Sequence, residues 1–300
     1  MKHTLKITLL LVLIFLITQV IGLSITNKYI DHKTTTISGK VAFEALPYNL
    51  ERPEIKQSTS YIWIISAVIL GTLLLLILIK FKKFGLWKLW FFLAVFFTMA
   101  IAFAAFINHV IAAILAFILA LMKIFKPTTI IQNLTEVFIY GGLAAIFVPI
   151  INVFAAFALL ILISIYDIIA VTQTKHMIKL AKFQTKSKIF AGLLIPYERR
   201  RDKVILGKKD IDKKVKLGKI AVLGGGDIGF PLLFAGVIMK GLMLNNAELI
   251  GFLKTLIIPV FVSLALLYLL VKGKQDKFYP AMPYLTAGCV IGYLVVLLFF

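Results

Sequence analysis

The sequence predicts an all-α polytopic membrane protein, and two observations carry this prediction. First, 61% of the 300 residues are hydrophobic and only 15% are charged, with a mean hydropathy of +1.00; a soluble domain is about half apolar and about a quarter charged. Second, uncharged runs of about 20 residues recur, and each is long enough to cross a hydrocarbon core of about 30 Å. We therefore expect a single membrane domain, residues 1–300, with about nine transmembrane helices.

The expected spans follow one another along the chain, with polar, basic or turn-forming connections between them. They lie at about 7–25, 61–79, 89–107, 110–122, 136–150, 152–173, 220–239, 247–271 and 279–300.

The first run follows Lys2 and Lys6 and so shares the basic start of a signal peptide. Because no small-residue cleavage site closes this run, we expect it to be a transmembrane helix.

Two of the apolar stretches are too long for one helix each. As a single helix, residues 89–122 would extend about 51 Å, against a hydrocarbon core of about 30 Å. Asn108 is expected to divide this stretch at a tight turn. Pro149 and Asn152 are expected to divide residues 136–173 in the same way.

The last three spans follow a long hydrophilic loop, residues 174–219, which carries 15 Lys and Arg residues and four acidic residues. The first part of the loop, residues 175–183, is typical of a basic amphipathic helix at the membrane interface. The loop as a whole fits either a solvated connector or a regulatory or substrate-facing segment. Within the eighth span, Pro259 predicts a kink.

The charge distribution predicts how the chain is oriented in the membrane. The net charge is +20, from 33 Lys and Arg against 13 Asp and Glu. The aromatic residues lie in apolar runs and not among the basic residues, which argues against nucleic acid as a partner. Of the basic residues, 26 fall on the side of the N-terminus and six on the other side. The positive-inside rule then predicts a multi-pass protein of the cell membrane with its N-terminus and the 174–219 loop in the cytoplasm and Phe300 outside.

Two aspartates lie inside apolar spans, Asp167 near the end of 152–173 and Asp227 near the start of 220–239. A charged residue at the centre of a bilayer costs about 2.5–3.5 kcal/mol on the insertion scale, so such a residue usually has a partner or a function. The two spans are consecutive and antiparallel, and both carboxylates are expected about 9–11 Å below the cytoplasmic edge. Their common depth makes them a candidate pair.

Two carboxylates a few ångströms apart share one proton near neutral pH, because they do not both ionise easily. Such a pair supplies a general base that takes a proton from water and a general acid that donates a proton to a peptide carbonyl oxygen. A peptide bond in a transmembrane helix must first be unwound. Gly224, Gly225 and Gly226, directly before Asp227, suit this need, because glycine permits close approach of another backbone and weakens a helix.

A proline pair marks the start of the last span, in the segment Pro280-Ala281-Met282-Pro283. Proline removes an N–H donor and disfavours helix in the residue before it. By the predicted orientation, this segment lies on the same side of the membrane as the two aspartates. The pattern alone leaves two interpretations open, a plain helix N-terminus and a non-helical segment that lines a site.

The sequence predicts no metal and no cofactor. The four histidines, His3, His32, His109 and His176, are scattered and show no ligand spacing. The single cysteine, Cys289, excludes an intramolecular disulfide and a cysteine-based metal site.

The motifs, taken in order, resemble those of the presenilin and signal peptide peptidase family, the GxGD-type intramembrane aspartyl proteases. The family's YD pair, GxGD motif and PAL motif lie on the sixth, seventh and ninth of nine helices, and here they read Tyr166-Asp167, Gly224-Gly225-Gly226-Asp227 and Pro280-Ala281-Met282. The long loop between the sixth and seventh spans also matches, so the resemblance covers most of the chain. It is closest to the presenilin-like proteases of archaea.

The resemblance implies an aspartic endopeptidase that hydrolyses peptide bonds within or near transmembrane helices, with Asp167 and Asp227 as the catalytic pair and water as the nucleophile. It further implies that the other motif residues, namely Tyr166, Gly224, Gly225, Gly226, Pro280, Ala281 and Met282, bind substrate or shape the active site. The substrates would be single-span membrane proteins or signal-peptide-like segments in the lipid bilayer. The resemblance leaves open whether the protein forms a homo-oligomer. The PAL motif departs from the family at Met282, which is close to leucine in volume.

Three other interpretations of the two aspartates fit the sequence less well. A proton- or cation-coupled transporter would use Asp167 and Asp227 as a relay, but it predicts inverted repeats and further polar groups along a path. Structural carboxylates paired with Lys or Arg are disfavoured because no basic residue lies near either aspartate in its span. A protease resembling the prepilin peptidases would cleave short basic leaders outside the membrane core, and the nine-span layout argues against it.

Overall fold

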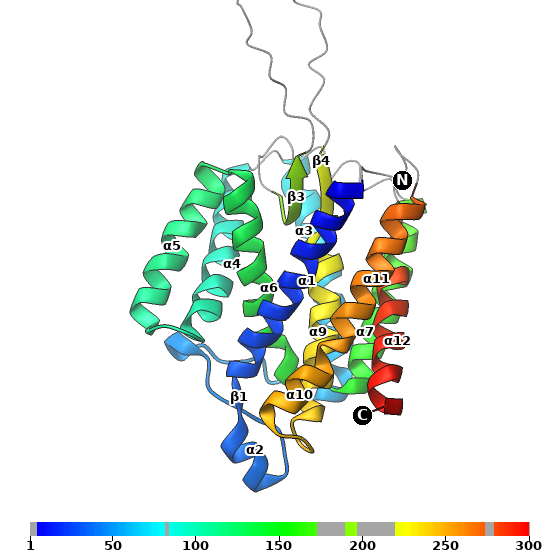
Figure 1. Ribbon diagram of the computed structural model, residues 1–300. Coiled ribbons are helices and arrows are strands. Elements are labelled where there is room, and N and C mark those ends of the chain that lie inside the picture. The colour runs from blue at the N-terminus through cyan, green and yellow to red at the C-terminus, as the bar shows by residue number, and fades with distance from the viewer. Residues whose placement is uncertain (1–4, 82–83, 173–189, 197–219, 274–278, 300) are drawn as a thin grey trace, which may run out of the picture.

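The structure is a computed structural model that describes residues 5–81, 84–172, 190–196, 220–273 and 279–299. Helices dominate the described residues (Figure 1), which confirms the predicted all-α membrane fold. The long helices are α1 Leu5–Lys28, α3 Ser60–Lys80, α4 Phe84–Ala104, α5 His109–Phe125, α6 Thr129–Phe147, α7 Val153–Thr172, α9 Gly225–Leu242, α11 Ile257–Lys272 and α12 Met282–Phe299. Among the described residues, eight helical segments are long and apolar enough to span a membrane, and α5 is a shorter apolar helix of 17 residues.

The helices break where the sequence offers capping residues. Asn108 caps α5, and its side-chain oxygen accepts a hydrogen bond from the Val110 N–H at 2.9 Å. Asn152 precedes α7, and its side-chain oxygen accepts one from the Ala155 N–H at 2.8 Å. A short 3₁₀ turn, Val148–Ile150, separates α6 from α7. Asparagine at these positions satisfies N–H groups that have no partner within the helix.

The segment before Asp227 is a strand and not the start of the seventh helix. Residues Ile220–Gly224 form β4, which pairs antiparallel with β3, Gly192–Pro196, so that Gly192 lies opposite Gly224. The expected span 220–239 therefore begins at Gly225, and Asp227 lies in the first turn of α9 instead of about seven residues inside it. The reason is the glycine run, which is a poor helix interior, combined with a β-strand partner further back in the chain.

One other boundary differs from the expected one, and the break expected near Pro259 is present. Helix α6 begins at Thr129 and not near Glu136, because the Thr128 hydroxyl caps it by accepting a hydrogen bond from the Ile131 N–H at 3.2 Å. The eighth span is divided into α10, Glu248–Thr255, and α11. Pro259 accounts for this division, because it lacks the N–H that would donate to the Thr255 carbonyl in a continuous helix. The predicted amphipathic helix at 175–183 lies outside the described residues.

Short elements cover the end of the bundle opposite β3 and β4 (Figure 1). They are β1 Ile30–Asp31, α2 His32–Ser38, β2 Ala42–Phe43 and the 3₁₀ turns Pro47–Asn49 and Gln57–Thr59. β1 and β2 pair antiparallel. These elements connect α1 to α3 and lie far from the two aspartates along the bundle.

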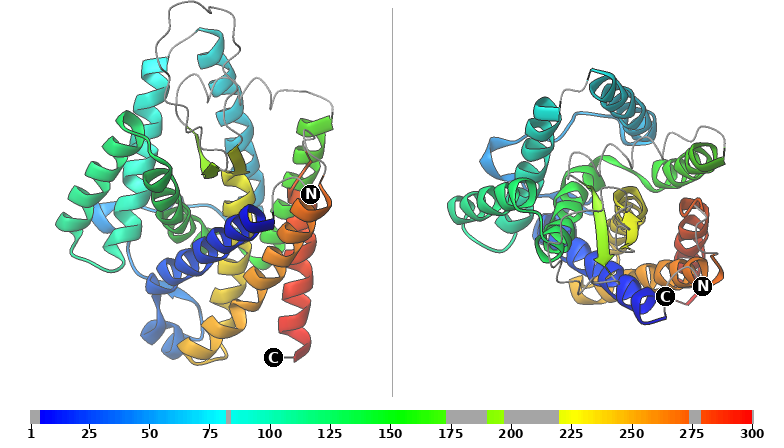
Figure 2. Two further views of the ribbon diagram at one scale, coloured as in Figure 1. Left: turned by 45° about the horizontal axis from the view of Figure 1, so that its top comes forward. Right: turned by 90° about the horizontal axis from the view of Figure 1, so that it is seen from above.

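Helix α9 lies in the middle of the bundle, as the view from above in Figure 2 shows. It packs against α1, α6, α7, α11 and α12, and the main core forms around it from buried residues that include Phe15, Leu160, Leu232 and Leu285. The close approach of α1 depends on Gly22, where a Cβ atom would collide with the Leu232 side chain. The helix that carries Asp227 is thus held on several sides.

Candidate active site

Helix α7 presents Asp167 to the start of α12. One oxygen of its half-buried carboxylate accepts a hydrogen bond from the backbone N–H of Met282 at 3.0 Å. Met282 is the first residue of α12, and residues 279–281 before it are not helical. Its N–H is therefore one of the donors that a helix leaves without an internal partner. The structure brings Asp167 and the Pro280–Met282 segment into direct contact.

A second polar link holds α7 against α12 nearly one turn from Asp167. The hydroxyls of Ser164 and Thr286 are hydrogen-bonded to each other at 2.8 Å. Ser164 is buried and Thr286 is partly buried. Sequence reasoning missed this pair, because a single serine or threonine in an apolar helix is common and gives no local sign of its partner. Together the two contacts fix the register between α7 and α12.

Asp227 is the third residue of α9, directly after the glycine run. Its half-buried side chain folds back over the residue that precedes the helix, so that a Cβ atom on Gly224 would lie 3.3 Å from one carboxylate oxygen. A carboxylate in the first turn of a helix is stabilised by the helix dipole. Because α9 packs against both α7 and α12, one three-helix unit carries Asp167, Asp227 and the proline-containing segment.

The three glycines before Asp227 have different surroundings. A Cβ atom on Gly225 would collide with the hydroxyl of Tyr140 and lie 3.3 Å from two of its ring carbons. A Cβ atom on Gly226 would make only ordinary contacts, 3.5 Å from the Phe230 ring. Of these three positions, Gly225 therefore tolerates a side chain least. The sequence alone does not distinguish it from Gly224 and Gly226.

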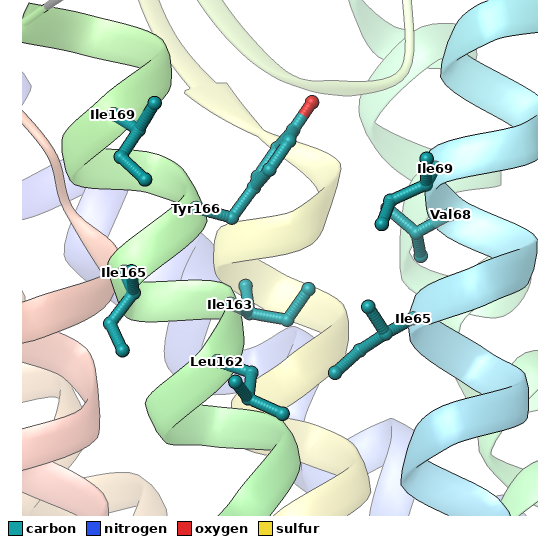
Figure 3. A pocket seen from close by; sticks show the side chains of 8 residues that line it. All are labelled: Ile65, Val68, Ile69, Leu162, Ile163, Ile165, Tyr166 and Ile169. Atoms are coloured by element: carbon teal, nitrogen blue, oxygen red, sulfur yellow. The ribbon is translucent and has the colours of Figure 1, made fainter.

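An apolar groove runs between α3 and α7 beside Tyr166, as Figure 3 shows from close by. Its lining comprises Ile65, Val68, Ile69, Leu162, Ile163, Ile165, Tyr166 and Ile169. Tyr166 is 40% exposed, and α3 has few buried side chains. The groove thus follows the face of α7 that carries Tyr166, the residue before Asp167.

A buried polar cluster, missed by sequence reasoning, lies between α5, α6 and the start of α9. We call it the α6 polar cluster, and it consists of Lys123, Gln132, Thr135, Glu136 and Tyr140. The Lys123 ammonium lies 2.6 Å from a Glu136 carboxylate oxygen and donates to Thr135 at 2.9 Å and to Gln132 at 3.1 Å. The other Glu136 oxygen accepts a hydrogen bond from the Tyr140 hydroxyl. Glu136 is thus a third carboxylate within the membrane helices.

A sequence signal for this cluster does exist. Gln132, Glu136 and Tyr140 are spaced four residues apart, which places them on one face of a helix. The expected fifth span, 136–150, instead begins at Glu136, because a charged residue usually marks the boundary of an apolar run.

No group of three or more His, Cys, Asp or Glu side chains within the described ranges is arranged to hold a metal ion. Cys289 is buried in α12. His32 and His109 lie at the end of the bundle opposite β3 and β4, on different elements.

Comparisons with known proteins agree on one family. Residues 12–300 match the family model described as "Signal-peptide peptidase, presenilin aspartyl protease". Two solved structures of a presenilin family intramembrane aspartate protease, in space groups C222 and P2, resemble this fold. The first has a TM-score of 0.60 at 19% identity over 97% of this chain and 98% of the other. The second has a TM-score of 0.57 at 19% identity over 96% of each chain. No curated protein matches the chain in sequence.

Proposed function

We propose, because this chain belongs to the signal-peptide peptidase and presenilin aspartyl protease family, that Asp167 and Asp227 are its catalytic pair. The family membership confirms the predicted activity: the protein is a multi-pass intramembrane aspartyl protease, an aspartic endopeptidase. The observation that carries the residue assignment is the packing of α7, α9 and α12 against one another, with Asp167 on α7 hydrogen-bonded to the start of α12 and Asp227 in the first turn of α9. Cleavage of a single-span test peptide should be lost when either aspartate is replaced. No observation supports the alternative of a coupled transporter.

The proposed mechanism uses the two carboxylates with one proton between them. The ionised carboxylate takes a proton from water, the water oxygen attacks the peptide carbonyl carbon, and the protonated carboxyl group donates its proton to the carbonyl oxygen. The tetrahedral intermediate then breaks down as a proton passes to the peptide nitrogen, which leaves as an amine. The hydrogen bond from the Met282 N–H orients the Asp167 carboxylate during these steps.

The proposed substrates are single-span membrane proteins or signal-peptide-like segments. The apolar groove between α3 and α7 supports this, because its isoleucine and leucine side chains match the surface of a transmembrane helix and its lining includes Tyr166, which precedes Asp167 in the sequence. The non-helical residues 279–281 lie on the other side of Asp167. A substrate segment that unwinds there would find main-chain groups available for hydrogen bonding.

The proposed role of Pro280 is to keep α12 from starting earlier. In the Pro280→Ala variant we expect α12 to extend toward Tyr279, which would move the Met282 N–H from the place where it donates to Asp167. The cleavage rate per folded enzyme should fall at least about tenfold, equivalent to about 1.4 kcal/mol.

Pro283→Ala is the matched control for this substitution. Pro283 lies in the first turn of α12, where its missing N–H has no intrahelical partner to lose, and Pro280 still limits the helix in this variant. Its cleavage rate should stay within about threefold of the wild type. If Pro280→Ala lowers the thermal stability but leaves the rate unchanged, the segment is a structural cap and not part of the active site.

The proposed orientation places the N-terminus in the cytoplasm and Phe300 outside. In the structure, α1 begins at the same end of the bundle as β3 and β4, and α12 ends at the other (Figure 1). The charge count supports this orientation, with one correction on each side. Lys123 and Lys240 are buried in the bundle and are not loop charges, which leaves the large excess of basic residues on the N-terminal side unchanged.

A reporter enzyme that is active only in the cytoplasm tests this orientation. Inserted within the 174–219 loop it should be active, and fused after Phe300 it should be inactive, because the basic connections are retained on the cytoplasmic side. Activity after Phe300 but not in the loop would reverse the orientation.

A further inference from the structure

We infer that the α6 polar cluster is a positioning device, which holds the first turn of α9 and thereby sets the place of Asp227 for proteolysis. This inference rests on the proposed catalytic role of Asp227. It adds Glu136 and Tyr140 to the residues on which the reaction depends, as positioning residues that do not themselves touch the substrate.

The cluster is buried and its members are hydrogen-bonded to one another. The exposed fractions of Lys123, Gln132, Glu136 and Tyr140 are 2%, 5%, 1% and 5%. One oxygen of Glu136 accepts from Lys123 at 2.6 Å and from Gln132 at 2.9 Å, and the other accepts from the Tyr140 hydroxyl. A buried network in which every member has partners is rigid, because breaking any bond would leave a polar group unpaired in a medium of low dielectric constant. The position of the Tyr140 hydroxyl is therefore fixed from α5 and α6.

The cluster and its neighbour Asn133 also hold the β-sheet that leads into α9. The side-chain amide of Gln132 donates to the carbonyls of Phe190 at 2.8 Å and Gly192 at 2.9 Å. Asn133 pairs with the backbone of Leu194 in both directions, donating to its carbonyl at 2.8 Å and accepting from its N–H at 2.9 Å. β3 is thus anchored to α6, and β3 in turn fixes the register of β4, which ends at Gly224.

The second contact is with α9 itself. The Tyr140 side chain lies against Gly225 and, with its ring, against Gly229, where a Cβ atom would lie 3.6 Å from a ring carbon. These two glycines are four residues apart and therefore share one face of α9. Asp227 lies between them in the sequence. The distance at which the first turn of α9 packs on α6 is therefore set by Tyr140, and the place of its hydroxyl is set by Glu136.

Two single substitutions form a matched test of this role. Tyr140→Phe removes the hydroxyl that donates to Glu136. Tyr29→Phe removes an equally buried hydroxyl, which donates to the Ile101 carbonyl at 2.8 Å at the opposite end of the bundle. Both variants lose one buried hydrogen bond and should have lower unfolding temperatures, with the larger fall for Tyr140→Phe because its acceptor is a carboxylate. Only Tyr140→Phe should lower kcat, by about tenfold with KM changed less than about twofold, because a small displacement of a catalytic group lowers the rate of the chemical step.

A double-mutant cycle with Gly225 tests the contact directly. Gly225→Ala places a methyl group against the Tyr140 hydroxyl, and we expect kcat to fall about a hundredfold, as for a displacement of about 1 Å at a catalytic group. Tyr140→Phe removes the colliding atom, so the double variant should be at least about tenfold faster than Gly225→Ala alone. Such coupling is the signature of two residues in contact, and general destabilisation would not produce it.

Three outcomes decide whether the cluster has this positioning role. Asp227→Ala is measured in the same experiment to test the catalytic pair itself. Coupling in the cycle together with a kcat effect confined to Tyr140→Phe supports the inference. If the effects of Tyr140→Phe and Gly225→Ala on kcat simply multiply, or if Tyr29→Phe lowers kcat as much as Tyr140→Phe, the positioning role is overturned while the catalytic pair stands. If Asp227→Ala retains activity, the proposed catalytic pair and the positioning role are both overturned.

Discussion

Replacement of Asp167 or Asp227 by alanine is expected to lower the cleavage rate at least about a thousandfold, because general acid–base catalysis by a positioned group contributes about 10²–10⁴-fold and the pair acts as a unit. The measurement is the cleavage rate of a single-span test peptide per folded enzyme, with the folded fraction obtained from size-exclusion chromatography in detergent. Each variant should remain inserted in the membrane, since both side chains are only half-buried.

Asparagine variants separate proton transfer from structure in this experiment. Asp167→Asn keeps an oxygen that can accept the hydrogen bond from the Met282 N–H, but it cannot exchange a proton with the substrate, so it should be as inactive as Asp167→Ala. Asp31→Ala is a suitable control, because Asp31 is a half-exposed carboxylate that caps α2 at the opposite end of the bundle. Near wild-type cleavage by either active-site variant would show that the residue assignment is wrong.

The largest effect on stability is expected for Glu136→Gln. This change leaves the Lys123 ammonium without a counter-charge at a site where both side chains are 1% exposed. Removing one partner of a buried ion pair typically costs about 3–5 kcal/mol, so the unfolding temperature in detergent should fall markedly.

The double variant Lys123→Met with Glu136→Gln should recover most of this loss, because neutral side chains of similar size replace buried ion pairs with little change in stability. Glu248→Gln is the matched control, since Glu248 pairs at 3.6 Å with His32 and its side chain is 52% exposed; its effect should be much smaller. A Glu136→Gln variant as stable as the wild type would contradict the ion-pair description of the α6 polar cluster.

The sequence predicts most of the helices well, because the signal for a membrane span is local. An apolar run of sufficient length indicates a span wherever its partners lie, and Asn108 and Asn152 mark helix starts through their own side chains. Asp167 and Asp227 are conspicuous for the same reason, since each interrupts an apolar run. Their motif order was enough to identify the family, which the family model confirms.

The strand β4 was missed because its signal is not local. Ile220–Gly224 is an apolar run that fits a buried helix and a buried strand equally well. Its partner β3 lies within a loop that its composition marks as hydrophilic. The consequence is functional: Asp227 lies in the first turn of α9, beside a β-sheet, and not deep within a helix.

The α6 polar cluster was missed for a different reason. A charged residue at the edge of an apolar run ordinarily marks a boundary of a span, and both Lys123 and Glu136 lie at such edges. Each is in fact neutralised by the other inside the bundle, and only the packing of α5 against α6 reveals this. Tyr140 and Gly225 likewise become a pair only when α6 meets α9.

The most direct test of the proposed catalytic pair is to incubate the purified protein in detergent with a single-span peptide, with and without a transition-state inhibitor of aspartic proteases. The fragments are identified by mass spectrometry. We predict a cut within or near the transmembrane segment that disappears at saturating inhibitor and is absent in Asp227→Asn. Cleavage that persists at saturating inhibitor and in Asp227→Asn would contradict the assignment of Asp167 and Asp227 as the catalytic pair.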